Sequence, residues 1–199
     1  DPLWSRGLGD VYKRQLERGG RTAAEIPELY ARWAGEGARE IFFQTWGGDA
    51  SSLLRNAEGI RALGDRVVVK VPATRDGFAA ASALVRDGAT VLVTAVYSVA
   101  QALVCASIGA QYIAPYLGRM RDAGIDGDAV IARMQGMCAG SDSNVLAASL
   151  RSPDDITGLR LAGVPYFTAA PDVIEQMLFH GVSDSSAAEF DAAMVRLGA

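Results

Sequence analysis

Short apolar runs alternate with longer segments of helical periodicity along most of this chain. The runs occupy residues 40–45, 66–71, 90–95, 112–115, 144–149 and 166–169. Between them, residues 50–63, 76–87, 99–109 and 153–162 carry Ala, Leu, Arg and Glu at helical spacing. Alternating strands and helices joined by short loops predict a parallel sheet, and continuous apolar strands indicate that both faces of the sheet are covered.

Residues that start and stop helices stand at the expected boundaries. Ser98 precedes one helical segment, and Ser152 with Pro153 supplies an N-cap and a first-turn proline for another. Glycines close the segments that lead into the next strand: Gly64, Gly88, Gly109 and Gly163.

Polar residues recur near the carboxyl ends of the predicted strands: Gln44, Lys70, Thr94 and Ser149, with Tyr116 just past another. The mouth of a (β/α) barrel gathers such residues into one site. The competing fold is a doubly wound sheet, but neither G-x-G-x-x-G nor G-x-x-x-x-G-K-[ST] follows any strand. The pattern therefore favours a barrel.

Six strands are two fewer than a (β/α)8 barrel contains, and residues 1–38 offer only one helix, at 22–37. Residues 1–15 have neither period and resemble translated adapter sequence, so we expect a non-native segment followed by a single truncated barrel domain at 16–199. The alternative is a genuine irregular N-terminal arm. If the first two strands are missing, we expect the polypeptide as written to be inactive and poorly soluble.

Composition excludes several classes of function. The 199 residues are half apolar, and a net charge of −4 argues against nucleic-acid binding. No apolar run could cross a membrane and no signal peptide is visible, so we expect a cytoplasmic protein. Cys105 and Cys138 lack a C-x-x-C spacing, and the single histidine, His180, makes a histidine triad or a His-rich metal site improbable.

Lys70 is one of only two lysines in the chain and lies within a valine-rich strand. A charged amine there costs several kcal/mol unless it is solvated, paired or deprotonated. The position of Lys70 in the sequence does not by itself decide among these states. One interpretation is an amine kept for covalent chemistry. The other is a strand-end lysine whose stem packs while its head reaches water.

Four motifs in order identify a family: VKVPAT at residues 69–74, VTAVYS at 93–98, APYLGR at 114–119 and LAASLR at 146–151. Together they resemble the transaldolase family, and within it the fructose-6-phosphate aldolase-like branch, from about residue 21 onward. The resemblance implies a (β/α)8 barrel of the class I aldolase type that needs no cofactor or metal. It also implies a sugar-phosphate substrate, and we expect the full-length form to be a homo-oligomer.

The resemblance implies roles for four interior residues. Lys70 matches the family's Schiff-base lysine, and burial among apolar residues favours the neutral, nucleophilic amine. Tyr116 and Gln44 match the tyrosine and the water-holding glutamine of the aldolase-like branch, and Thr94 matches a threonine near the lysine. Transaldolases of the pentose phosphate pathway instead have phenylalanine and glutamate at the positions of Tyr116 and Gln44.

A second group is expected to bind phosphate. Guanidinium groups and a hydroxyl suit a phosphate monoester, and by resemblance Arg119, Ser149 and Arg151 hold the phosphate of the sugar. Taken singly, each arginine is more typical of a solvated surface charge. His180 and both cysteines have no counterpart role, and we interpret them as structural.

The chain departs from the family at its N-terminal end. Neither the L-D-T/S-A motif with its proton-transferring aspartate nor the T-N-P-S motif is present, and Asp1 and Asp10 are not candidates for that role. The alternatives to an active aldolase of the fructose-6-phosphate type are a transaldolase of the pentose phosphate pathway and a catalytically incompetent fragment that only binds sugar phosphate. A deoxyribose-phosphate type of aldolase would require a second barrel lysine, which the body of the chain lacks.

Overall fold

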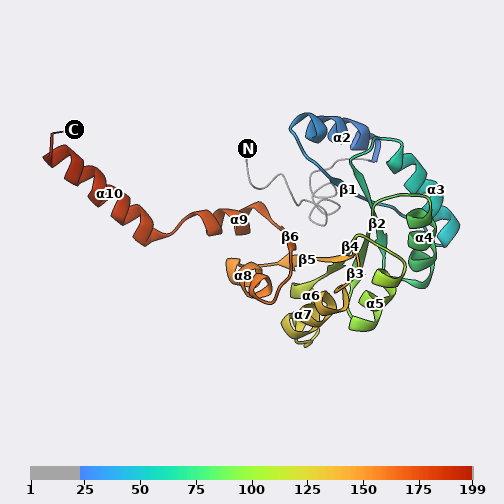
Figure 1. Cartoon of the computed structure of the whole chain (residues 1–199). Coiled ribbons are helices and arrows are strands. Elements are labelled where there is room, and N and C mark those ends of the chain that lie inside the picture. Colours follow the sequence, from blue (N-terminus) through green and yellow to red (C-terminus); the bar gives the residue numbers. More distant parts are fainter. Residues whose placement is uncertain (1–22, 199) are drawn as a thin grey trace.

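Six parallel strands form one curled sheet in the computed structural model, which describes residues 23–198 (Figure 1). The strands follow the order of the sequence, each paired with the next. They are β1 (Ile41–Gln44), β2 (Val67–Pro72), β3 (Val91–Val96), β4 (Tyr112–Pro115), β5 (Asn144–Leu150) and β6 (Tyr166–Ala169). The predicted partial (β/α) barrel is therefore confirmed, whereas the expectation for residues 1–15 lies outside the described residues.

Helices flank the strands in the chain, and all but the last of them lie around the outside of the curled sheet (Figure 1). They are η2 (Ala23–Glu25), α2 (Ile26–Gly35), α3 (Ala50–Arg61), α4 (Arg75–Arg86), α5 (Val99–Ser107), α6 (Leu117–Asp122), α7 (Gly127–Met137), α8 (Pro153–Leu161), α9 (Pro171–Leu178) and α10 (Gly181–Arg196). The predicted N-caps are confirmed: the hydroxyls of Ser98 and Ser152 accept hydrogen bonds from the third residues of α5 and α8.

Strands β1 to β5 each divide their side chains between two hydrophobic clusters. In β2, Val67, Val69 and Val71 pack outward with the helices, whereas Val68 belongs to the smaller inner cluster. Because side chains alternate along a strand, Lys70 points inward with Val68. The same alternation applies to β1 and β3, so the inner face receives the polar residues that follow the inward apolar ones.

Aromatic rings close the inner face at the amino ends of the strands. The ring of Tyr112 in β4 meets those of Phe42 in β1 and Tyr166 in β6 edge-on, with centroids 5.6 and 5.5 Å apart. The Tyr112 hydroxyl also donates to Glu40 at 2.8 Å. These contacts join the first, fourth and sixth strands, so they hold the sheet in its curl and leave the carboxyl ends for the site.

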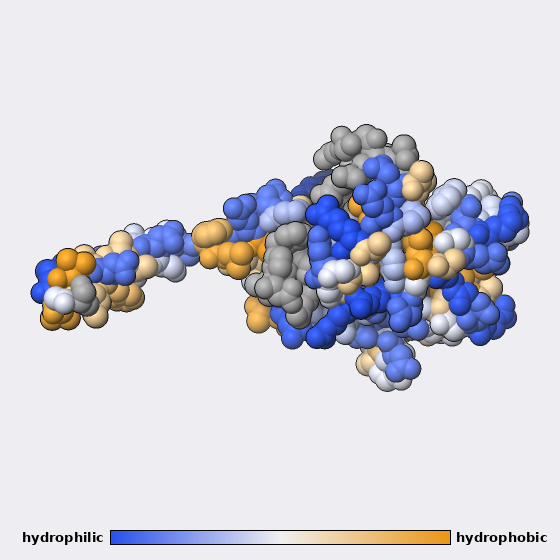
Figure 2. Space-filling model, turned by 90° about the horizontal axis from the view of Figure 1, so that it is seen from above, coloured by the Kyte–Doolittle hydropathy of each residue, from blue (hydrophilic) through white to orange (hydrophobic). Residues whose placement is uncertain are grey.

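The C-terminal helix leaves the barrel. Beyond α9, residues 179–180 are extended, and α10 projects away from the other helices (Figures 1 and 2). No residue of α10 is buried, although it carries large apolar side chains such as Phe190 and Met194. Within the described residues, this arm differs from the helices before it, which pack on the sheet or on a neighbouring helix.

Candidate active site

Lys70 occupies the interior of the curled sheet. Its side chain is only 2% exposed and faces inward from β2, between Gln44 of β1 and Leu92 of β3 in the strand register. The turn that follows β2 is tightly built, because a Cβ on Gly77 would lie 1.8 Å from the carbonyl oxygen of Pro72. Only glycine permits this approach, so the carboxyl end of the lysine strand is held against the start of α4.

Thr94 and Tyr116 form a buried hydroxyl pair on the same inner face. Thr94 Oγ1 and the Tyr116 hydroxyl are 2.7 Å apart, and the side chains are 3% and 5% exposed. The Tyr116 ring meets Tyr97 edge-on at 6.0 Å. The Arg119 guanidinium carbon lies 4.9 Å from the centre of the same ring, which is a favourable cation–π contact. Tyr116 is therefore held from three directions.

Gln44 lies at the edge of this interior and is half-buried. Its side-chain amide donates to the carbonyl oxygens of Thr45 at 2.9 Å and Lys70 at 3.1 Å. The amide nitrogen is thus held by the backbone of the lysine strand, which leaves the amide oxygen as the group that can accept a further hydrogen bond.

Gln101 connects two loops at the mouth, and sequence reasoning missed it. Its side-chain oxygen accepts from the backbone N–H of Tyr97 at 2.9 Å, and its nitrogen donates to the carbonyl of Ala73 at 3.3 Å. The loop carrying Tyr97 is thereby joined to the loop that follows the lysine strand. The sequence could have indicated this only through the position of Gln101 three residues after the N-cap Ser98.

Two of the predicted phosphate-binding residues lie close together around Gly118. A Cβ on Gly118 would lie 2.6 Å from Arg151 Nε and 2.9 Å from Ser149 Oγ, so a glycine is required for these groups to approach the start of α6. Ser149 is half-buried, whereas Arg151 is exposed. Arg119 projects from the same short helix over the Tyr116 ring.

The Arg151 guanidinium already has a carboxylate partner. It donates to both oxygens of Asp122, one of them at 2.8 Å, and both side chains are more than half exposed. The pair raises the pKa of Arg151 and lowers the pKa of Asp122. An exposed ion pair contributes little stability.

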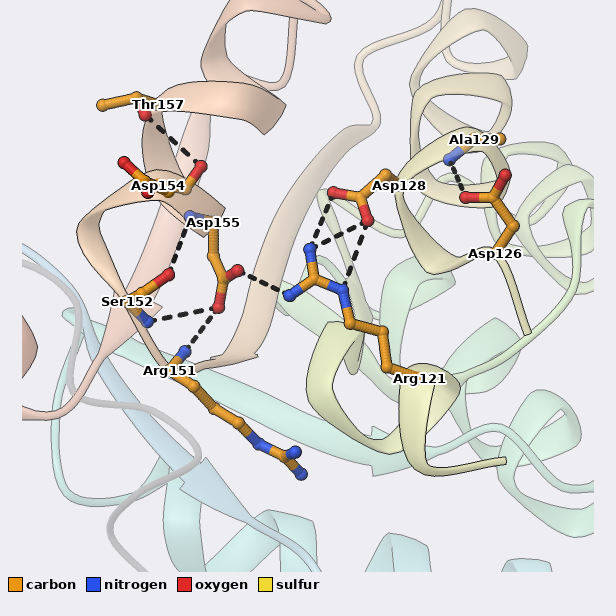
Figure 3. Close-up of polar contacts among 9 residues, drawn as sticks. All are labelled: Arg121, Asp126, Asp128, Ala129, Arg151, Ser152, Asp154, Asp155 and Thr157. Atoms are coloured by element: carbon orange, nitrogen blue, oxygen red, sulfur yellow. Dashed lines mark hydrogen bonds and ion pairs between the residues drawn. The ribbon is translucent and has the colours of Figure 1, made fainter. Parts of the chain in front are cut away.

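Asp155 supports the backbone beneath Arg151 (Figure 3). It is 5% exposed and accepts from the backbone N–H groups of Arg151 at 2.7 Å and Ser152 at 3.2 Å, and from the Arg121 guanidinium at 2.6 Å. Burial alone would raise the pKa of Asp155, but these donors outweigh it and the pKa is lowered. Arg121 also pairs with Asp128, so the network joins α6, α7 and α8.

The remaining candidates lie elsewhere. Cys105 and Cys138 are free and buried in the outer core, and His180 is the exposed N-cap of α10, the helix that projects from the barrel (Figure 1). Among residues 23–198 no three His, Cys, Asp or Glu side chains gather as a possible metal site. In the same range, no helix has both the length and the apolar character to cross a membrane.

The fold and the inward lysine define a parallel α/β barrel with an amine buried at the carboxyl ends of its strands. The Transaldolase/Fructose-6-phosphate aldolase family profile matches residues 18–198, and the chain belongs to this family. A relative from Hyphomonas neptunium, named "Probable transaldolase", is 33% identical over 92% of this chain and 84% of its own. One of the same name from Maridesulfovibrio salexigens is 35% identical over 76% and 72%.

Solved structures support the barrel alone. A mandelate oxidase with (S)-2-phenylpropionate aligns with a TM-score of 0.56 at 17% identity. The alignment covers 72% of this chain, which spans about half the length of that structure at 51%. At this identity the likeness shows a shared fold and carries nothing about substrate.

Proposed function

We propose that the protein is a Schiff-base aldolase or transaldolase that cleaves or transfers the dihydroxyacetone unit of a ketose phosphate such as fructose 6-phosphate. The observation that carries the proposal is Lys70, an amine 2% exposed on the inner face of the barrel. Family membership supports it, because the family's description names both activities.

Lys70 supplies the covalent chemistry in this proposal. Its neutral amine attacks the C2 carbonyl of the ketose, water leaves, and a protonated iminium forms. A base removes the proton of the C4 hydroxyl, the C3–C4 bond breaks to release an aldehyde, and the electron pair is accepted by the iminium to give an enamine. Protonation of the enamine and hydrolysis of the imine release dihydroxyacetone, whereas attack on a second aldehyde transfers it.

Tyr116 acts as the proton-transfer group, positioned by Thr94. The support is the 2.7 Å contact between their hydroxyls on the inner face shared with Lys70. Gln44 holds a water or substrate oxygen through its amide oxygen. The tyrosine and glutamine favour release of dihydroxyacetone over transfer, and a transaldolase of the pentose phosphate pathway is the second candidate.

Arg119, Ser149 and Arg151 bind the phosphate of the substrate. Their support is the clustering of Ser149 and Arg151 around Gly118 and the presence of Arg119 on the same helix. Planar guanidinium donors bind phosphate oxygens in pairs. Arg151 would exchange its contact with Asp122 for the substrate phosphate.

Trapping with borohydride tests the proposal. Reduction in the presence of dihydroxyacetone or fructose 6-phosphate should add the mass of the reduced adduct to the peptide that contains Lys70, and Lys70→Met should abolish the label. Lys13 is the internal control, since it should remain unmodified. A label elsewhere, or none in the full-length protein, would overturn the mechanism.

We also propose that a second copy of the chain covers α10. The helix leaves its own barrel, and Phe190, Met194 and Leu197 share one exposed face. Exchange of such an element between identical copies is a low-cost route to an oligomer. Light scattering should show an oligomer that Phe190→Ser with Met194→Ser dissociates, whereas the control Glu189→Gln does not. A monomer before substitution would refute this.

The edge strands of the described sheet affect the solubility and activity that we expect of the polypeptide. Within residues 23–198, β1 and β6 are each paired on one side only, and unpaired edges promote aggregation. We therefore propose that a polypeptide of residues 1–199 alone is poorly soluble and inactive. A monodisperse protein that melts cooperatively and turns over substrate would contradict it.

A further inference from the structure

Thr168 carries the one buried side-chain oxygen or nitrogen among residues 23–198 that has no hydrogen-bond partner. It is 3% exposed. Other buried hydroxyls in the described part are satisfied: Thr45 donates to Leu53 O at 2.7 Å, and Ser143 to Ala110 O at 2.6 Å. Buried polar groups in folded proteins are nearly always paired, so an unpaired hydroxyl requires an explanation.

The strand pattern places this hydroxyl on the inner face. In β6, Phe167 and Ala169 pack outward with the helices, whereas Tyr166 meets the inward ring of Tyr112. Thr168 follows Tyr166 by two residues in a strand without interruption, so it shares the inner face.

The neighbouring strand brings Thr168 beside the proposed site. Ala147 pairs with Phe167 and Leu150 with Ala169, so Ala148 and Ser149 both oppose the single residue Thr168. Such a two-against-one arrangement is a β-bulge, a feature common beside active sites. Ala148 is in turn paired with Tyr116 on the other side. Thr168 in β6 is therefore separated from Tyr116 by one strand, β5.

We propose that the Thr168 hydroxyl binds a hydroxyl of the three-carbon ketone unit held at Lys70. A threonine hydroxyl both donates and accepts, which matches a polyhydroxylated chain. Thr168 points into the barrel, whereas Arg119 and Arg151 gather around the start of α6, so its hydroxyl suits the hydroxyls of the sugar rather than the phosphate. The inference rests on the proposed function and adds a residue that selects a hydroxylated donor.

The test compares two ketones that differ by one hydroxyl. The concentration that gives half-maximal borohydride trapping at Lys70 is measured for dihydroxyacetone and for hydroxyacetone in the full-length protein. Thr168→Val, which keeps the shape and removes the hydroxyl, should raise this concentration for dihydroxyacetone about two- to tenfold. It should leave the value for hydroxyacetone nearly unchanged, and Thr168→Ser should restore the response to dihydroxyacetone.

Thermal melting separates this role from a structural one. Removal of an unpaired buried hydroxyl should leave the melting temperature equal or higher in Thr168→Val, whereas the matched control Thr45→Val loses a made hydrogen bond and should melt lower. An unchanged response to dihydroxyacetone, an equal loss on both ketones, or failure of Thr168→Ser to restore binding would overturn the inference. Absence of any label at Lys70 in the unsubstituted protein would overturn the proposed function and this inference together.

Discussion

The hydroxyl pair of Thr94 and Tyr116 can be dissected by a double-mutant cycle. Tyr116→Phe keeps the ring and its edge contact with Tyr97 but removes one partner of the 2.7 Å hydrogen bond. The Thr94 hydroxyl, in a side chain 3% exposed, then loses this partner. A buried group left unsatisfied costs about 1–3 kcal/mol, so we expect the free energy of unfolding to fall by that amount.

The second single variant and the double variant complete the cycle. Thr94→Val removes the other partner of the same hydrogen bond. The double variant removes both hydroxyls and should cost less than the sum of the single variants by about 1 kcal/mol or more. Urea denaturation followed by circular dichroism measures each value. Costs that add within about 0.5 kcal/mol would show that the hydroxyls do not interact, and the reasoning would fail.

Kinetics on the same variants separate stability from catalysis. If Tyr116 transfers protons, Tyr116→Phe should lower kcat about 10²- to 10⁴-fold while the imine at Lys70 still forms. Thr94→Val keeps the phenol and should lower kcat less. Turnover by Tyr116→Phe equal to that of the unsubstituted protein would exclude the tyrosine as the proton-transfer group.

Three further predictions concern the arginines proposed to bind phosphate, Asp155 and Cys105. Arg119→Ala or Arg151→Ala should raise KM about ten- to a hundredfold for a phosphorylated ketose but much less for a non-phosphorylated analogue, and equal losses would exclude phosphate binding. Because the pKa of Asp155 is lowered from 3.8, the stability that it contributes is present above pH 3.8 and lost as pH falls through the lowered pKa. Asp155→Asn should therefore be less stable than the unsubstituted protein at neutral pH. Chemical denaturation should show that the difference in their free energies of unfolding becomes smaller below pH 3.8. Burial raises the pKa of Cys105 to about 12, so a thiol reagent at pH 8 should label it only after unfolding, and rapid labelling of the folded protein would contradict its burial.

The strands could be predicted from the sequence because they are buried on both sides. A largely apolar run such as residues 66–71 indicates a buried strand where strands and helices alternate along the chain. Two strands, β4 and β6, begin and end at the predicted residues 112–115 and 166–169. The curl of the sheet was harder to predict from the sequence, because it depends on contacts between the Tyr112 ring and rings from strands more than 50 residues away in each direction.

The inward direction of the polar residues follows from alternation, but their partners do not. Lys70 and Thr94 each come two residues after an inward apolar residue, so the period of a strand predicts their direction. The pairing of Arg151 with Asp122 joins residues 29 apart on separate elements, and no local pattern encodes it. Thr168 was missed because one threonine in a short strand carries no signal until the opposing bulge is known.

Backbone strain marks the strand ends on either side of Tyr116. Ala95 in β3 and Ser149 in β5 adopt φ values of 60° and 59°, and the register of each strand shifts there. This conformation costs a non-glycine residue about 1–2 kcal/mol, which glycine would avoid. The side chains explain why glycine is absent: Ala95 packs against the inner cluster, and Ser149 presents a hydroxyl beside Gly118. The bulges therefore direct both side chains toward the site at a cost that the surrounding barrel must offset, and Thr168 lies opposite one of them.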